Sequence, residues 1–155
     1  MNTACYQYPM IMGKPLRSID ADCAKCVPQM EELQQMEQAW ATRGGWQHAL
    51  NLMGEADDVL LLHGRALKQG EGESPAIKCV QRYQASDLLL FYGQYKLAAD
   101  SALERGEEFN ELLNGSALGM LETFHRAVRK LLIPFLACPH SEMLMPNSPF
   151  LVFQT

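Results

Sequence analysis

SPAIKCVQRYQASDLLLFYGQYKLAADSALERG, residues 74–106, is the stretch that decides the fold. Its opening Ser-Pro pair favours a helix start, because serine caps the first turn and proline fits the first helical position. Apolar side chains follow at helical spacing, namely Ile77, Val80, Leu88, Phe91, Tyr95 and Ala98. The pattern predicts a helix over 75–105. Since about 30 residues is long for a globular helix, a break near Ser86 or Gly93 is expected.

Two more helices are expected upstream of this stretch. The first begins near Pro28, has acidic residues in its first turn, and ends where Gly44 and Gly45 interrupt the pattern. The second extends over about 46–69, and Gly54 is a point where it can bend.

Downstream, the chain predicts a short helix over 107–113 and a last helix that begins at Ser116 and is kinked by Pro134. The tail from residue 138 onward is rich in proline, so an extended conformation is expected there. Residues 1–19 contain proline and glycine and little periodicity, which predicts an irregular arm.

These elements together predict an all-α fold, an up-and-down helical bundle of four to five helices. The irregular N-terminal arm (1–19) and the C-terminal tail (138–155) would flank it. A chain of 155 residues falls in the usual size range of one domain, so residues 1–155 are expected to form a single helical domain.

Charge and composition exclude several classes of function. Thirteen basic residues against eighteen acidic ones give a net charge of −5, which opposes binding to nucleic acid. The sequence contains no run of about 18 apolar residues, and its start lacks the pattern of a signal peptide, so no membrane span and a cytoplasmic location are expected. Five cysteines is an odd number, which favours reduced thiols.

The most distinctive local motif is Cys23-Ala24-Lys25-Cys26. Its position just before the helix expected at Pro28, together with the neighbouring lysine, favours lowered thiol pKa values. Three interpretations stay open: a redox pair, half of a zinc site completed by Cys138 and His140, and ordinary isolated thiols. Isolated thiols rank first, because the two pairs are far apart in sequence and the thioredoxin pattern is missing.

No other motif specifies a reaction. Glu122 and His125 have the spacing of half a di-iron site, but such sites need the motif twice and it occurs once. The sequence also lacks a glycine-rich phosphate loop, a dinucleotide fingerprint and a zinc-protease helix. The balance favours binding over catalysis.

The leading functional hypothesis is therefore a small, non-enzymatic regulator, adaptor or chaperone-like protein that binds another protein through apolar helix faces. Nine methionines are many for this length, and they suit either an irregular helical core or a surface that accepts a partner helix. The tail residues Phe150, Leu151, Val152 and Phe153 are candidate interface residues, and a homodimer is expected. No resident cofactor is expected. The alternative hypothesis is a thiol-redox enzyme or a zinc-dependent sensor centred on Cys23 and Cys26.

Overall fold

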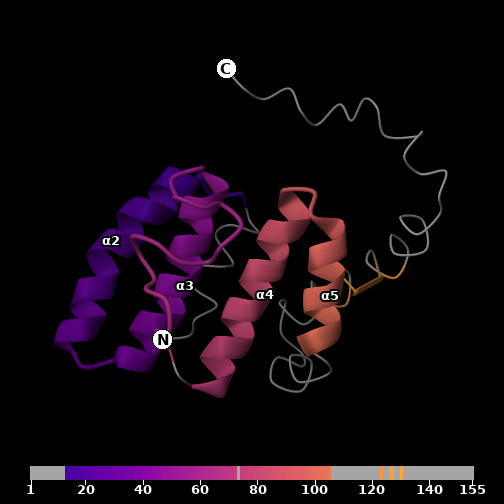
Figure 1. Cartoon of the computed structure of the whole chain (residues 1–155). Helices are drawn as coiled ribbons and strands as arrows, with labels where there is room; N and C mark the ends of the chain where they lie inside the picture. Colours follow the sequence, from indigo (N-terminus) through magenta and orange to yellow (C-terminus); the bar gives the residue numbers. More distant parts are fainter. Residues whose placement is uncertain (1–12, 73, 106–122, 124–125, 128–129, 131–155) are drawn as a thin grey trace.

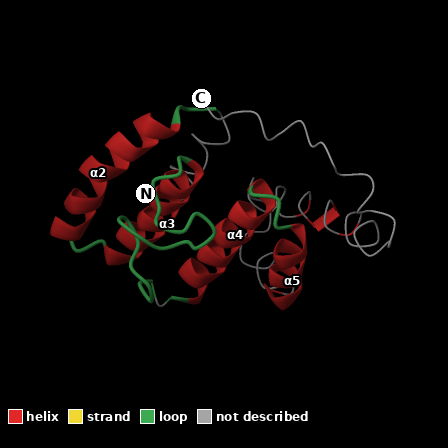
Figure 2. Ribbon diagram, turned by 45° about the horizontal axis from the view of Figure 1, so that its top comes forward, coloured by secondary structure: helices red, strands yellow, loops and turns green. Residues whose placement is uncertain are grey.

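The computed structural model of the chain describes residues 13–72, 74–105, 123, 126, 127 and 130. All regular secondary structure in these residues is helical, so the predicted all-α fold class is confirmed (Figures 1 and 2). The helices are α2 (Leu16–Glu32), α3 (Met36–Leu52), α4 (Pro75–Phe91) and α5 (Tyr95–Arg105). None of them is long and apolar enough to cross a membrane.

The four helices form two hairpins. Three residues connect α2 to α3, and three residues, Tyr92 to Gln94, connect α4 to α5. Such short connections make consecutive helices antiparallel neighbours. The break predicted near Gly93 is thus confirmed, because the chain turns back there instead of continuing one long helix.

The two hairpins have the same local construction. Both first helices contain 17 residues. In both turns a backbone N–H bonds back to the carbonyl five residues earlier, from Gln35 to Met30 and from Gln94 to Leu89. This Schellman pattern needs a left-handed residue, which is Gln34 at φ 56° in one turn and Gly93 at φ 75° in the other.

Helices α3 and α4 run parallel to each other. Gly44 lies against Gln84, His48 lies 3.1 Å from Asp87, and the hydroxyl of Tyr92 bonds to the carbonyl of residue 51. The paired positions therefore rise together along both helices, so these two consecutive helices do not alternate in direction as the predicted up-and-down topology requires. Residues 53–72, here called the crossover, must return the chain to the end at which α3 began (Figure 2).

The structure moves the first helix start from Pro28 to Leu16. Proline 28 lies inside α2, on its exposed side, and residues 16–19 of the expected irregular arm are helical. The helix extends through the proline because its buried side chains recur at helical spacing and pack toward α3. These side chains are Ile19, Cys23, Val27 and Met30. Residues 1–12 of the arm lie outside the described part of the chain.

The structure also places Gly44 and Gly45 inside α3, where both are buried, and not at a helix end. An added Cβ at Gly44 would lie 2.8 Å from Oε1 of Gln84, so glycine here permits the close approach of α4. The helix expected over 46–69 ends at Leu52, and Gly54 at φ 74° follows its last turn.

Of the two downstream helices, the one expected over 107–113 lies outside the described residues. The last expected helix is described at four positions, all of them helical, namely Thr123, Arg126, Ala127 and Lys130.

Gln34 offers a direct test of the hairpin turn. Its left-handed backbone costs a residue with a side chain roughly 1 kcal/mol, which glycine avoids. Gln34→Gly should therefore raise the free energy of unfolding in urea by up to about 1 kcal/mol. The matched control is Gln29→Gly at an exposed position inside α2, which should lower it by about 1 kcal/mol. A loss of stability in both variants would contradict the turn geometry.

Candidate functional site

The two cysteines of the sequence motif lie in the middle of α2, one turn apart. Cys23 is fully buried, and burial, followed by the nearby Cys26 and two aspartates, raises the pKa of its thiol to about 12. The thiol of Cys26 is half-buried and donates to the carbonyl of Cys23 at 3.6 Å. The expected low pKa is wrong for Cys23, because the helix starts well before it and the dipole of a helix start acts only within the first turn.

The other two residues of the hypothetical zinc site, Cys138 and His140, lie outside the described residues, as do the tail residues Phe150, Leu151, Val152 and Phe153. The four-ligand hypothesis and the role of the tail therefore stay predictions. Within the part of the chain that the structure describes, no three His, Cys, Asp or Glu side chains gather closely enough to hold a metal ion.

A connected set of hydrogen bonds joins α3 to the crossover. It centres on Gln47 and Asn51, which lie one turn apart on α3 and are fully buried. Nε2 of Gln47 donates to Oδ1 of Asn51 at 2.8 Å, so the two amides orient each other. Buried amides of this kind are costly unless they are fully hydrogen-bonded.

The crossover supplies the remaining partners through its main chain. Oε1 of Gln47 accepts from the N–H of Ala66 at 2.9 Å and of Leu67 at 3.3 Å. Nδ2 of Asn51 donates to the carbonyls of Val59 at 3.0 Å and Leu61 at 2.7 Å, and to that of residue 58 at 3.4 Å. Two side chains of α3 thus bond to five backbone groups of a segment that has no regular secondary structure, with the two N–H donors of Asn51 shared among three carbonyls.

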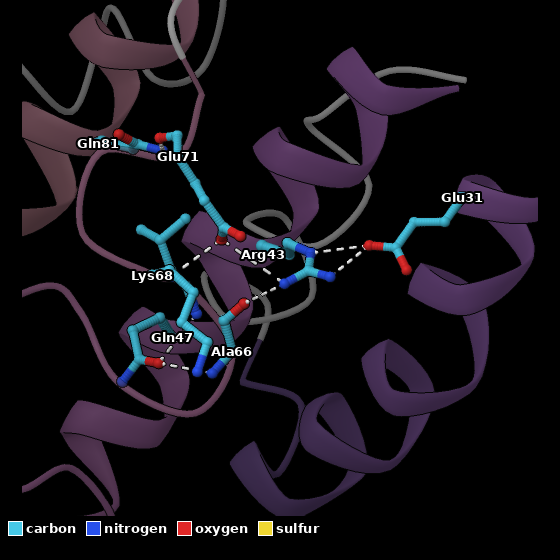
Figure 3. Close-up of polar contacts among 8 residues, drawn as sticks. Glu31, Arg43, Gln47, Ala66, Lys68, Glu71 and Gln81 are labelled. Atoms are coloured by element: carbon cyan, nitrogen blue, oxygen red, sulfur yellow. Dashed lines mark hydrogen bonds and ion pairs between the residues drawn. The ribbon is translucent and has the colours of Figure 1, made fainter. Parts of the chain in front are cut away.

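Arg43, one turn before Gln47, ties the crossover to α2 (Figure 3). Its guanidinium pairs with the carboxylate of Glu31 on α2, lies 3.6 Å from that of Glu71, and donates to the carbonyl of Ala66 at 3.2 Å. The side chain is only 21% exposed, so these charges are partly shielded from water. Arg43, Gln47 and Asn51 form one continuous row, which we call the α3 polar face.

A second group of contacts holds the crossover against α2. Oδ1 of Asp20 accepts from Nε1 of Trp46 at 2.7 Å and from Arg65 at 2.9 Å. The guanidinium of Arg65 lies over the Trp46 ring at 5.9 Å from its centroid. The crossover is therefore fixed to the first hairpin at several separate points.

The contact between the two hairpins contains polar groups as well. Nε2 of His48 lies at ion-pair distance from Oδ2 of Asp87, 3.1 Å, without the alignment of a hydrogen bond. The amide of Gln84 is buried beside Gly44 and makes no hydrogen bond to the described residues. These groups carry no arrangement of nucleophile, base and orienting residue.

Large apolar side chains are exposed at both hairpin turns. Leu33 is 70% exposed and Met36 is 39% exposed at the turn of the first hairpin. Phe91, at 67%, and Leu97, at 52%, flank the turn of the second. Leu61, on the crossover, is the remaining exposed large apolar residue in the described part of the chain.

Sequence reasoning missed the α3 polar face. A signal was present, because Gln47 and Asn51 are four residues apart and share the face of an otherwise apolar segment. It was not recognised since the helix was expected to begin only at residue 46, so that both amides fell in its first turns, where polar residues are common.

The raised pKa of Cys23 predicts a specific alkaline instability. Below about pH 9 the thiol is protonated in both the folded and the unfolded chain. Between pH 9 and 12 only the unfolded chain releases the proton, so the free energy of unfolding should fall by roughly 1.4 kcal/mol per pH unit on this account. Urea titrations should show this decline reduced in Cys23→Ala and retained in Cys26→Ala, which keeps the buried thiol. Equal declines in all three proteins would refute the assignment.

Gly64 tests whether the α3 polar face fixes the crossover. Its backbone has φ 153°, and an added Cβ would lie 2.9 Å from Nε2 of Gln47, a side chain that its own hydrogen bonds prevent from moving aside. Gly64→Ala should lower the free energy of unfolding by about 2–3 kcal/mol. Gly70→Ala, at φ 84° with open space around it, should cost about 1 kcal/mol from backbone strain alone. Thermal unfolding of both variants gives the comparison, and equal losses would show that Gln47 is not held in place.

Comparison with known proteins finds no match: no family model, no curated protein and no solved structure matches this chain. The function must therefore be argued from the side chains themselves.

Proposed function

We propose that this chain is a small, non-enzymatic regulator or adaptor that binds another protein through apolar side chains at the ends of its helical hairpins. The observation that carries the proposal is the exposure of Phe91 and Leu97 on either side of one turn. Exposed large aromatic and aliphatic side chains that lie on a rigid support are the usual anchors of protein interfaces.

The support beneath Phe91 is well built. Its ring meets that of Tyr92 edge to face, with the centroids 5.3 Å apart. The hydroxyl of Tyr92 in turn donates to the carbonyl of Asn51 at 2.6 Å, and burial raises the pKa of this phenol. Phe91 thus projects from a turn that is fastened to the end of α3, so little conformational freedom would be lost on binding.

A two-fold homodimer and a chaperone-like role belong to the same proposal, because a second copy of the chain or an unfolded client can cover the same apolar side chains. A cytoplasmic location fits the free thiol of Cys23 and the odd number of cysteines in the chain, which favours reduced thiols. The alternative centred on the cysteines has less support, since the buried Cys23 is a poor thiolate.

Capture from an extract of the source cells tests the proposal. Immobilised wild-type chain should retain a defined protein or a second copy of itself, and Phe91→Ser and Leu97→Ser should each reduce retention at least about tenfold, as expected for an apolar anchor. Lys96→Ser, at an exposed position on the same hairpin, is the matched control and should retain the partner.

Circular dichroism and light scattering complete the experiment. All variants should keep the helical spectrum of the wild type, since the changed side chains are exposed. A wild-type chain that is monomeric and retains no protein, or anchor variants that retain as much as Lys96→Ser, would overturn the proposal.

A further inference from the structure

The crossover contains more residues than are needed to connect α3 to α4. Because α3 and α4 run parallel, the chain must return about the length of one 17-residue helix, roughly 25 Å. About eight extended residues would span this distance. Residues 53–72 are more than twice as many, and they contain no helix or strand. Ordered loops of such length without regular structure are uncommon in compact domains and usually have a function.

The contacts that hold the crossover are made mostly to its main chain. Gln47 and Asn51 bond to backbone N–H and C=O groups of residues 58–67, and Arg43 adds the carbonyl of Ala66. Such contacts do not depend on which side chains the bound segment carries. The segment itself bends repeatedly, with internal turn bonds from the N–H of Leu61 to the carbonyl of residue 58 and from the N–H of Gly64 to that of Leu67. Main-chain contacts of this kind are also those by which a protein holds a bound peptide.

Few side chains of this segment are buried. Ala66 and Leu67 are 1% and 3% exposed, whereas Leu61 and Arg65 are exposed. The segment therefore combines main-chain hydrogen bonds to two amide side chains with one buried apolar anchor, while Val59, Leu60 and Leu62 are half-buried. A bound peptide needs little more, and a segment held by so few buried side chains can leave without unfolding the helices.

We propose that the α3 polar face is a peptide-binding site that residues 58–67 occupy as an intramolecular ligand. Its partner is a peptide that carries a small residue followed by leucine, that adopts the same bends as residues 58–67, and that replaces the crossover by taking over the same hydrogen bonds from Gln47 and Asn51. This site is separate from the apolar turns, so it goes beyond the function proposed above and does not rest on it.

Hydrogen exchange on the full chain gives the first test. The amides of Ala66 and Leu67, which bond to Gln47, should exchange at least a hundredfold faster than the amides in the middle of α3, because the crossover leaves while the helices stay folded. Exchange of both sets at the same rate, through global unfolding, would overturn the proposal.

A peptide supplied in trans gives the second test. A fluorescent peptide with the sequence of residues 57–69, DDVLLLHGRALKQ, should bind Leu67→Ser at least tenfold more tightly than wild type, because this change weakens the internal competitor and leaves the α3 polar face intact. The matched peptide with N-methyl groups at the positions of Ala66 and Leu67 lacks the two donors that bond to Gln47, and should bind at least tenfold more weakly.

The outcomes separate this proposal from that of the apolar turns. Phe91→Ser, added to the Leu67→Ser chain, should bind the peptide as tightly as Leu67→Ser alone. A variant that no longer captures a partner at the turns would then still bind the peptide at the α3 polar face. The proposal fails if the Leu67→Ser chain loses its helical spectrum, if it binds no peptide, or if the methylated and unmethylated peptides bind equally. The first result would make the crossover a fixed part of the fold.

Discussion

Burial of α3 on nearly all sides is the constraint on which the rest of the structure depends. The helix contacts α2 on one side, α4 on another and the crossover on a third. Small residues such as Ala39, Gly44 and Ala49 occupy positions where neighbours approach closely. Where α3 faces the irregular crossover, the amide side chains of Gln47 and Asn51 stand in place of small residues and hydrogen-bond to the main chain of the crossover. One helix thus carries two kinds of interface, and each accounts for a part of its sequence.

The elements that could be predicted are those with local signals. The Ser-Pro start of α4 and the glycine turn at residue 93 depend on nearby backbone geometry, and both lie where the sequence places them. The glycines of α3 could not be interpreted in this way. A glycine favours a helix end by its backbone freedom and a close helix crossing by its small size, and only the position of α4 decides between them. Pro28 presents the same ambiguity, since packing of α2 outweighs its local preference.

The chemistry of the candidate sites depended on these same helix boundaries. Moving the start of α2 from Pro28 to Leu16 takes Cys23 from a helix start into a buried helix interior, which reverses the expected direction of its pKa shift. Extending α3 back to Met36 puts Gln47 and Asn51 in its second half, facing the crossover. Residue types and spacings indicated which side chains could act, while the register of the helices determined what each of them does.

The parallel course of α3 and α4 also sets an order of folding. Contacts within each hairpin join residues that are close in sequence, such as Ser86 and Ala98, so they close small loops. Contacts between the hairpins join residues about 40 positions apart, as between Tyr92 and Asn51, and close a much larger one. Each hairpin can therefore form early by itself. Docking of the two hairpins comes later, because closing the larger loop costs more conformational entropy. An opened state with both hairpins formed and undocked would expose to solvent the buried side chains that meet between α3 and α4, such as His48 and Gln84.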